Sequence, residues 1–352
     1  MLTNTILFIP SILMKHRFSG TIPSMLLSVL IGSVLTYLFT HAMMTFNGKG
    51  IPEILEMFLP KWVNAVLLIY LGFMWFASGG LVAVSYSRIL QRFVNPDLNL
   101  FLLIAFLGIA CGWVATNGSR SVMYLMEIVL LLNLPMIGFI LFKTVTNENM
   151  DWDAVRVMIH YVWQWPNWES LAASTYVFTG YINWAIFNRT FRVDGRLSFL
   201  WIVTLTGTLV LTSTFIIPIG FFGTLGVDDF IYTWVSTADS MRMEFGFVER
   251  VLFVFLLLYL NVAMLFITVT WHVGAELMKS VIPKKYQEYA GRRPRMTSGV
   301  IIAVFLLLSE WTARMFDEKH YMMLTSAWFQ LRLPSEVALV LLIFWLGRRS
   351  KS

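Results

Sequence analysis

Several polar residues that could hold a small molecule lie inside apolar segments of the sequence. Thr179, Gly180 and Asn183 belong to the run TGYIN, which combines a helix-breaking residue with hydrogen-bond donors and acceptors. Asn261 and Thr268 are seven positions apart, so a helix would place both on one face. If these segments cross a membrane, each polar residue is a candidate for ligand binding, because polar groups are costly in lipid. Asn261 has an equally good alternative, a hydrogen bond to another helix.

Two further groups of candidates occur earlier in the chain. The first precedes Pro10, and the second occurs in the small-residue run WFASGG. A Thr hydroxyl can also bond to its own helix, and small residues often serve only close helix packing. Both explanations therefore stay open beside ligand binding. The residues concerned are Thr3, Asn4, Thr5, Ser78 and Gly79.

The ionisable residues do not form a recognisable catalytic or metal site. Glu127 and Glu310 lie within apolar segments, where each could relay a proton or neutralise an ammonium group, or else reach the headgroups or a loop Arg. His272 and Glu276 are four positions apart but lack further metal ligands, which favours a pair on a helix surface. There is no phosphate-binding glycine loop, HExxH motif or nucleophile elbow. We therefore expect no enzyme activity, cofactor or metal.

The elements that position these residues are predicted to be membrane helices. Of the 352 residues, 58% are hydrophobic and only 13% are charged, whereas soluble proteins keep about a quarter of their residues charged. The single cysteine, Cys111, excludes a disulfide framework. The net charge of +6 is better explained by basic loops that set membrane topology than by nucleic-acid binding.

Short connections join successive apolar segments, which predicts an all-α integral membrane protein with one domain over residues 1–352. The ten segments comprise residues 1–14, 21–45, 62–90, 99–117, 121–143, 171–188, 197–223, 247–278, 298–315 and 323–347. With an inner N-terminus, most Lys and Arg residues fall in inner loops, so both termini are predicted to be cytoplasmic. The Trp-rich stretch 151–170 is expected to be an interfacial helix or a re-entrant loop.

The lengths of the segments indicate an internal repeat. The third and eighth segments are long, whereas the first and sixth are short or interrupted, and the members of each pair are five segments apart. This pattern predicts two inverted five-helix repeats, about residues 1–145 and 171–315, with segment 323–347 completing the second. A generic ten-helix bundle with coincidental segment lengths is the alternative.

The first segment is too short to cross a membrane by itself. A spanning helix needs about 20 residues, and Lys15 ends this segment after residue 14. We expect the outer half of a broken first helix that is truncated at its N-terminus. Either the true start lies upstream, or the chain lacks one wall of its pocket.

Four longer stretches of the chain carry a family pattern. They are TNTILFIPSIL, NGKGIPEILEMFLPKWVNAVL, NGSRSVMYLMEIVLLLNLPM and FVERVLFVFLLLYLNVAMLFITVTWHVG. Over about residues 2–280 the chain resembles the B subunit of spore germinant receptors, the endospore germination permease family of the amino acid–polyamine–organocation (APC) transporter superfamily. The resemblance implies a LeuT-like fold in the bacterial cytoplasmic membrane or spore inner membrane. It also implies two partners, an A-type membrane subunit and a C-type lipoprotein subunit.

On this basis we expect a germination receptor subunit that binds a nutrient, typically an amino acid, and triggers germination. Segments one and six would line a pocket that segments three and eight close, and the ten candidate polar and small residues would be its ligand contacts. A free backbone N–H at a helix break would hold the ligand carboxylate. The alternatives are a secondary amino acid transporter driven by protons or sodium, and a structural subunit that binds no ligand.

Overall fold

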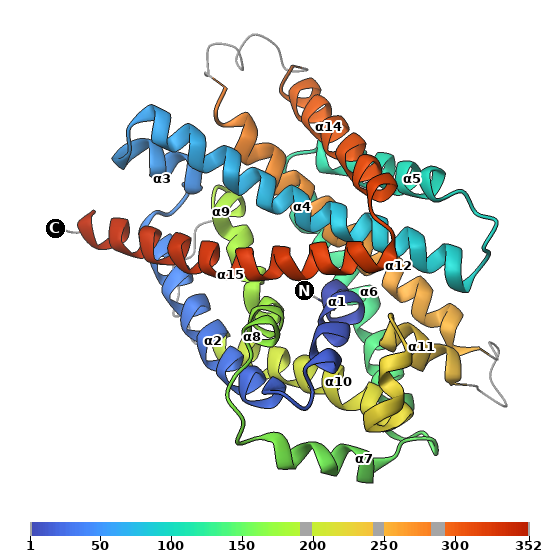
Figure 1. Cartoon of the computed structure of the whole chain (residues 1–352). Helices are drawn as coiled ribbons and strands as arrows, with labels where there is room; N and C mark the ends of the chain where they lie inside the picture. Colours follow the sequence, from blue (N-terminus) through green and yellow to red (C-terminus); the bar gives the residue numbers. More distant parts are fainter. Residues whose placement is uncertain (1, 191–198, 242–249, 283–292, 351–352) are drawn as a thin grey trace.

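The computed structural model describes residues 2–190, 199–241, 250–282 and 293–350, and the elements in these ranges are helices (Figure 1). The longer helices are α1 (Leu2–Lys15), α2 (Thr21–Thr45), α4 (Lys61–Phe93), α5 (Leu100–Ala115), α6 (Ser119–Val145), α10 (Leu200–Gly226), α12 (Val251–Lys279), α14 (Arg293–Met315) and α15 (Glu318–Arg349). The shorter elements are α3 (Ile51–Phe58), α7 (Trp152–Val157), η1 (Met158–Tyr161), α8 (Trp168–Thr175), η2 (Tyr176–Asn183), α9 (Trp184–Phe187), η4 (Val227–Asp229) and α11 (Thr233–Ser240).

Seven helices within the described ranges are long and apolar enough to cross a membrane. They are α2, α4, α6, α10 continued by η4, α12, α14 and α15. The helix α5 is apolar but shorter, and α1 has 14 residues. The prediction of an all-α, multi-pass membrane protein is therefore confirmed. Each of the ten predicted apolar segments contains a helix.

The sixth apolar segment is broken into α8, η2 and α9. The middle piece, η2, is a 3-10 helix of eight residues, longer than such helices usually run. Its Phe178 is 1% exposed and lies between two glycines of neighbouring helices, Gly32 on α2 and Gly207 on α10. A Cβ at Gly32 would lie only 2.6 Å from Cγ of Phe178. The absence of side chains at both glycines therefore makes room for the ring that anchors η2.

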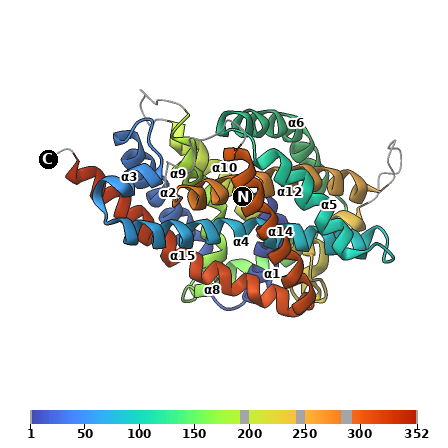
Figure 2. The same ribbon diagram turned by 90° about the horizontal axis from the view of Figure 1, so that it is seen from above.

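The buried apolar side chains form two clusters rather than one. The larger includes residues of α1, α8, α11 and α12, and the smaller joins the end of α2 and α3 to α9 and the end of α15. The helix α4 runs through the middle of the bundle and contributes to both clusters, whereas α6 lies along one edge (Figure 2). The boundary between the clusters is where the polar side chains described below are found.

The loops are held by polar contacts of single side chains. Arg17, after α1, forms an ion pair of 2.5 Å with Asp228 of η4 and donates to the carbonyl oxygen of Thr224. The side-chain amide of Asn188, after α9, donates to carbonyl oxygens at and beyond the end of α2, including that of Phe46 at 3.0 Å. The first bonds tie the end of α1 to α10 and η4, and the second tie the end of α9 to the end of α2.

The turn between α1 and α2 requires a glycine, which gives a stability prediction. Gly20 has φ +88°, and an added Cβ would overlap the carbonyl oxygen of Trp165 in the Trp-rich loop. Gly48 has a similar φ, +77°, but open space around it. We expect Gly48→Ala to cost about 1–2 kcal/mol of unfolding free energy, from backbone strain alone. Gly20→Ala should cost a further ~1–3 kcal/mol, from overpacking.

Thermal unfolding of the two purified variants in detergent measures this difference. Equal midpoints for the two variants would mean that the Trp-rich loop moves away from Gly20 without cost.

Candidate functional site

A cavity of about 100 Å³ lies between α4, η2, α12 and α15. Its wall is mostly apolar and includes Trp75 and Phe266. It lies where the two apolar clusters of the core meet, since Tyr176 belongs to one cluster and Leu339 to the other. The predicted ligand contacts that line this pocket are Ser78, Thr179, Gly180 and Asn183.

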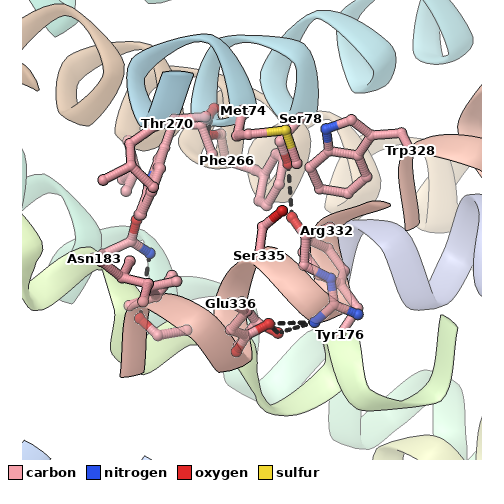
Figure 3. Close-up of a pocket in the computed structure, with 17 residues that line it drawn as sticks. Met74, Ser78, Tyr176, Asn183, Phe266, Thr270, Trp328, Arg332, Ser335 and Glu336 are labelled. Atoms are coloured by element: carbon pink, nitrogen blue, oxygen red, sulfur yellow. Dashed lines mark hydrogen bonds and ion pairs between the residues drawn. The ribbon is translucent and has the colours of Figure 1, made fainter. Parts of the chain in front are cut away.

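An ion pair between Arg332 and Glu336 lies on the pocket wall (Figure 3). The two residues are four positions apart near the midpoint of α15, and only 5% and 4% of their surfaces are exposed. Arg332 also donates to the hydroxyl of Thr175 at 2.9 Å and to the carbonyl oxygen of Ala172. Its guanidinium lies 5.0 Å from the centroid of the Tyr176 ring. Such a buried pair is tolerated only when its polar atoms have partners.

The 3-10 helix η2 supplies the partners of Glu336. Tyr181 donates its hydroxyl to Oε1, and Thr179 donates to Oε2 at 3.2 Å. The same Thr179 oxygen accepts a hydrogen bond of 3.1 Å from Nη1 of Arg332. The Nε atom of Arg332 is buried and has no hydrogen-bond partner within the described residues. The ion pair thus ties α15 to η2 and retains one unused donor.

A second group of polar contacts surrounds Tyr176, at the start of η2. Its hydroxyl lies 2.7 Å from Oγ of Ser78 and is also bonded to the side chain of Asn4. On another side of the pocket, Asn183 accepts a hydrogen bond of 2.9 Å from the indole of Trp75 (Figure 3). Asn4 therefore reaches the pocket only through Tyr176, whereas Ser78 and Asn183 line it directly.

Two of the remaining predicted contacts serve helix packing. Gly79 faces α12, where an added Cβ would lie 2.5 Å from Oγ1 of Thr270. Thr3 is buried and donates to the carbonyl oxygen of Val262 at 3.2 Å. Neither residue lines the pocket, so for both the packing explanation accounts for the observed contacts.

The other three predicted contacts also lie away from the pocket. Thr5 lines a separate, mostly apolar cavity of about 60 Å³ between α1, α6, α10, α11 and α12. Thr268 is buried and bonds to Cys111 of α5. Asn261 is half-buried on the same helix. The expected face of α12 carrying Asn261 and Thr268 is therefore not the face that lines the pocket.

Two charged residues of the pocket, Arg332 and Glu336, were not predicted from the sequence. Their signal is nevertheless present: they have opposite charges, are four positions apart, and lie inside the apolar segment 323–347. Side chains at this spacing meet on one face of a helix and can neutralise each other. Charged residues inside a membrane segment are costly, so each is also a candidate for a functional role.

The pair predicted between His272 and Glu276 does not form. His272 is 1% exposed, and its two ring nitrogens bond to the carbonyl oxygen of Ala115 at 2.8 Å and to the hydroxyl of Ser119 at 2.9 Å. Glu276 instead forms ion pairs with Arg189 at 3.4 Å and with Lys279, three positions later in its own helix. Across the described ranges, no cluster of three or more His, Cys, Asp or Glu side chains could hold a metal ion.

Comparison with known proteins identifies the family of the chain. The model of the spore germination protein family matches residues 1–316, which extends from α1 through the end of α14. No curated protein matches the chain. The family match includes the four stretches that resemble germinant receptor B subunits and the elements α4, η2 and α12 of the pocket. The chain therefore belongs to the spore germination protein family.

Proposed function

We propose that this chain is the nutrient-binding membrane subunit of a spore germination receptor and that its ligand is a small amino acid. The family supports a role in germination. The observation that carries the ligand assignment is the buried Arg332–Glu336 pair on the wall of a closely lined cavity. Ionisable groups at membrane depth are costly and are usually retained for function.

The chemistry of the pocket fits a zwitterion. An amino acid carries a carboxylate and an ammonium group on one carbon, and the pocket offers a guanidinium and a carboxylate side by side. The guanidinium of Arg332 suits the ligand carboxylate, and the carboxylate of Glu336 suits the ammonium group. Hydrogen bonds in which one partner is charged are stronger than hydrogen bonds between neutral groups. In this proposal the guanidinium, rather than a free backbone N–H, holds the carboxylate.

The apolar part of the wall restricts the ligand side chain. Trp75, Phe266 and Trp328 surround the polar groups and offer few hydrogen-bond partners. These large rings occupy much of the wall and leave it mostly apolar. We therefore infer that the ligand side chain is compact and uncharged.

We also propose that the ten helical segments form two inverted repeats in one domain, as in LeuT-like proteins. In that arrangement α1 and the broken segment α8–η2–α9 are equivalent, as are α4 and α12, which pack against each other. A ligand shifts a protein from one conformation to another only when it binds one of them more tightly. A ligand between α15 and η2 would favour one conformation by altering the contacts of Thr179 and Tyr181 with Glu336.

The proposed receptor is a complex in the spore inner membrane. The seven long apolar helices and the family support a multi-pass membrane subunit. We infer that an A-type membrane subunit and a C-type lipoprotein subunit complete the receptor, and that both termini of this chain are cytoplasmic. The bilayer and a small nutrient are its other partners, with no role for nucleic acid.

Two matched Thr substitutions test the pocket. Thr179→Val removes a hydroxyl bonded to both members of the ion pair, whereas Thr268→Val removes a buried hydroxyl outside the pocket. A hydrogen bond to a charged group is worth about 1.5–3 kcal/mol. We expect Thr179→Val to raise the amino acid concentration for half-maximal germination roughly tenfold or more. Thr268→Val should leave it unchanged.

Measuring spore germination as a function of amino acid concentration, with protein levels determined in parallel, tests this expectation. If both variants respond as the wild type does, the pocket is not the binding site. A ligand at 100 times its dissociation constant should also stabilise the purified chain by about 2.7 kcal/mol. Absence of this stabilisation at all concentrations would favour a structural subunit.

A secondary amino acid transporter is the second candidate function. A buried charge pair beside a broken membrane segment also suits a transport site. Uptake of the amino acid into liposomes that contain only the purified chain, driven by a proton or sodium gradient, would favour transport. A response that requires the other two subunits would favour the receptor.

A further inference from the structure

Glu127 on α6 is an acidic side chain that faces away from the bundle at membrane depth. It is exposed, and it has no hydrogen bond or ion pair within the described part of the chain. It lies seven residues after Arg120, which is about 10 Å along the helix axis. The stretch of α6 from Arg120 to Lys143 is long enough to cross a hydrocarbon layer of about 30 Å. Glu127 therefore lies within that layer, beyond the depth of Arg120.

The helix α6 is also the least buried of the seven candidate spans. Only 11% of its most apolar window is buried inside the protein, compared with 61% for α4. Figure 2 shows α6 along one edge of the bundle. Lipid can cover exposed apolar side chains, so their exposure needs no further explanation. Lipid tails cannot neutralise a carboxylate, so the exposure of Glu127 does need an explanation.

The residues around Glu127 form a continuous face suited to another helix. Leu131, Leu134 and Gly138 follow it by four, seven and eleven positions, which places all of them on one side of α6. The exposed fractions of the two leucines are 71% and 65%, and an added Cβ at Gly138 would have no neighbour within 4 Å. A glycine at such a position lets two membrane helices approach closely.

We propose that this face of α6 docks a transmembrane helix of a different protein, and that this helix places an Arg or Lys level with Glu127. The opposite charge neutralises the carboxylate in lipid. A second copy of this chain does not fit. Among the described residues, Lys and Arg lie in loops or within two turns of a helix end, with the exception of Arg332. Arg332 is buried against Glu336 and is not exposed for pairing.

A polyleucine transmembrane peptide with a single Arg at the depth of Glu127 tests this proposal. The labelled peptide and the labelled full chain are reconstituted together in phosphatidylcholine liposomes, and their association is measured by energy transfer. We expect the Arg peptide to associate at least about tenfold more tightly than an all-leucine peptide. Glu127→Gln should reduce its association to the all-leucine level. The matched variant Glu310→Gln, at a half-buried position of α14, should leave it unchanged.

Two further measurements fix the contact and control for misfolding. A photoreactive residue in place of Leu131 should cross-link the Arg peptide, whereas one in place of Leu209 on α10, which is 56% exposed, should not. The Glu127→Lys variant should no longer associate with the Arg peptide, and it should instead associate with a peptide that has Glu at the same depth. Equal association of the Arg and all-leucine peptides would overturn the proposal. So would Arg-peptide association that survives Glu127→Gln, or Glu127-dependent association only between copies of this chain.

Discussion

Replacing Glu336 with Gln is expected to destabilise the protein by about 3–5 kcal/mol, because it leaves a buried guanidinium without a counter-charge. The substitution keeps the shape of the side chain but removes the charge that Arg332 contacts. Gln has a single acceptor oxygen, so it would keep the hydrogen bond from Tyr181 or from Thr179 but not both. The loss of stability therefore reflects the missing charge together with one missing hydrogen bond. We also expect the variant to lose the nutrient response, since the proposed ammonium-binding group is gone.

The reciprocal variant, Arg332→Gln, should cost less. It leaves a carboxylate that can take up a proton and become neutral, whereas the guanidinium left by Glu336→Gln cannot lose its charge. Unfolding midpoints of the two purified variants in detergent measure this order. The opposite order would mean that Arg332 does not depend on the negative charge of Glu336.

The double variant with Leu at both positions separates stability from binding. Replacing a buried ion pair by apolar residues of similar volume is often neutral or stabilising. We therefore expect Arg332→Leu with Glu336→Leu to unfold near the wild-type midpoint but to show no response to an amino acid. A double variant that still responds with wild-type concentration dependence would exclude the pair from the binding site.

The helices of this fold were predictable because their signal is local. Apolarity and segment length determine which stretches cross a bilayer, and each of the ten apolar segments contains a helix. The break in the sixth segment was also visible, as the run TGYIN corresponds to the end of η2. Four of the ten predicted contacts line the pocket, and three of those four come from this run.

The remaining predicted contacts do not line this pocket because the rotation of a helix about its axis is set by packing. Asn261 and Thr268 do share a face of α12. The residues of that helix that line the pocket are Phe266, Val269 and Thr270. The close approach of Gly79 to Thr270 fixes that rotation. Such a contact joins residues almost two hundred positions apart in sequence, so no local pattern reveals it.

The anchoring of η2 by Phe178 gives the second large effect. Gly32→Val would place side-chain atoms where the ring now lies, since even a Cβ would be 2.6 Å from Cγ of Phe178. We expect a cost in unfolding free energy of ~3 kcal/mol, the upper end of typical overpacking. The matched control is Gly299→Val in α14, because a Cβ there would have no neighbour within 4 Å. That variant should unfold near the wild-type midpoint.

Combining Gly32→Val with Phe178→Ala shows whether the ring is the obstacle. Phe178→Ala alone should cost about 3–5 kcal/mol through the space that it leaves. If the new valine fills that space, the double variant will be more stable than the two single costs predict, by ~0.5–3 kcal/mol. Strict additivity would instead mean that Gly32 is constrained by something other than the ring. Because Thr179 directly follows Phe178, displacement of the ring also displaces a hydrogen-bond partner of Glu336. Gly32→Val should therefore weaken the nutrient response without touching the pocket itself.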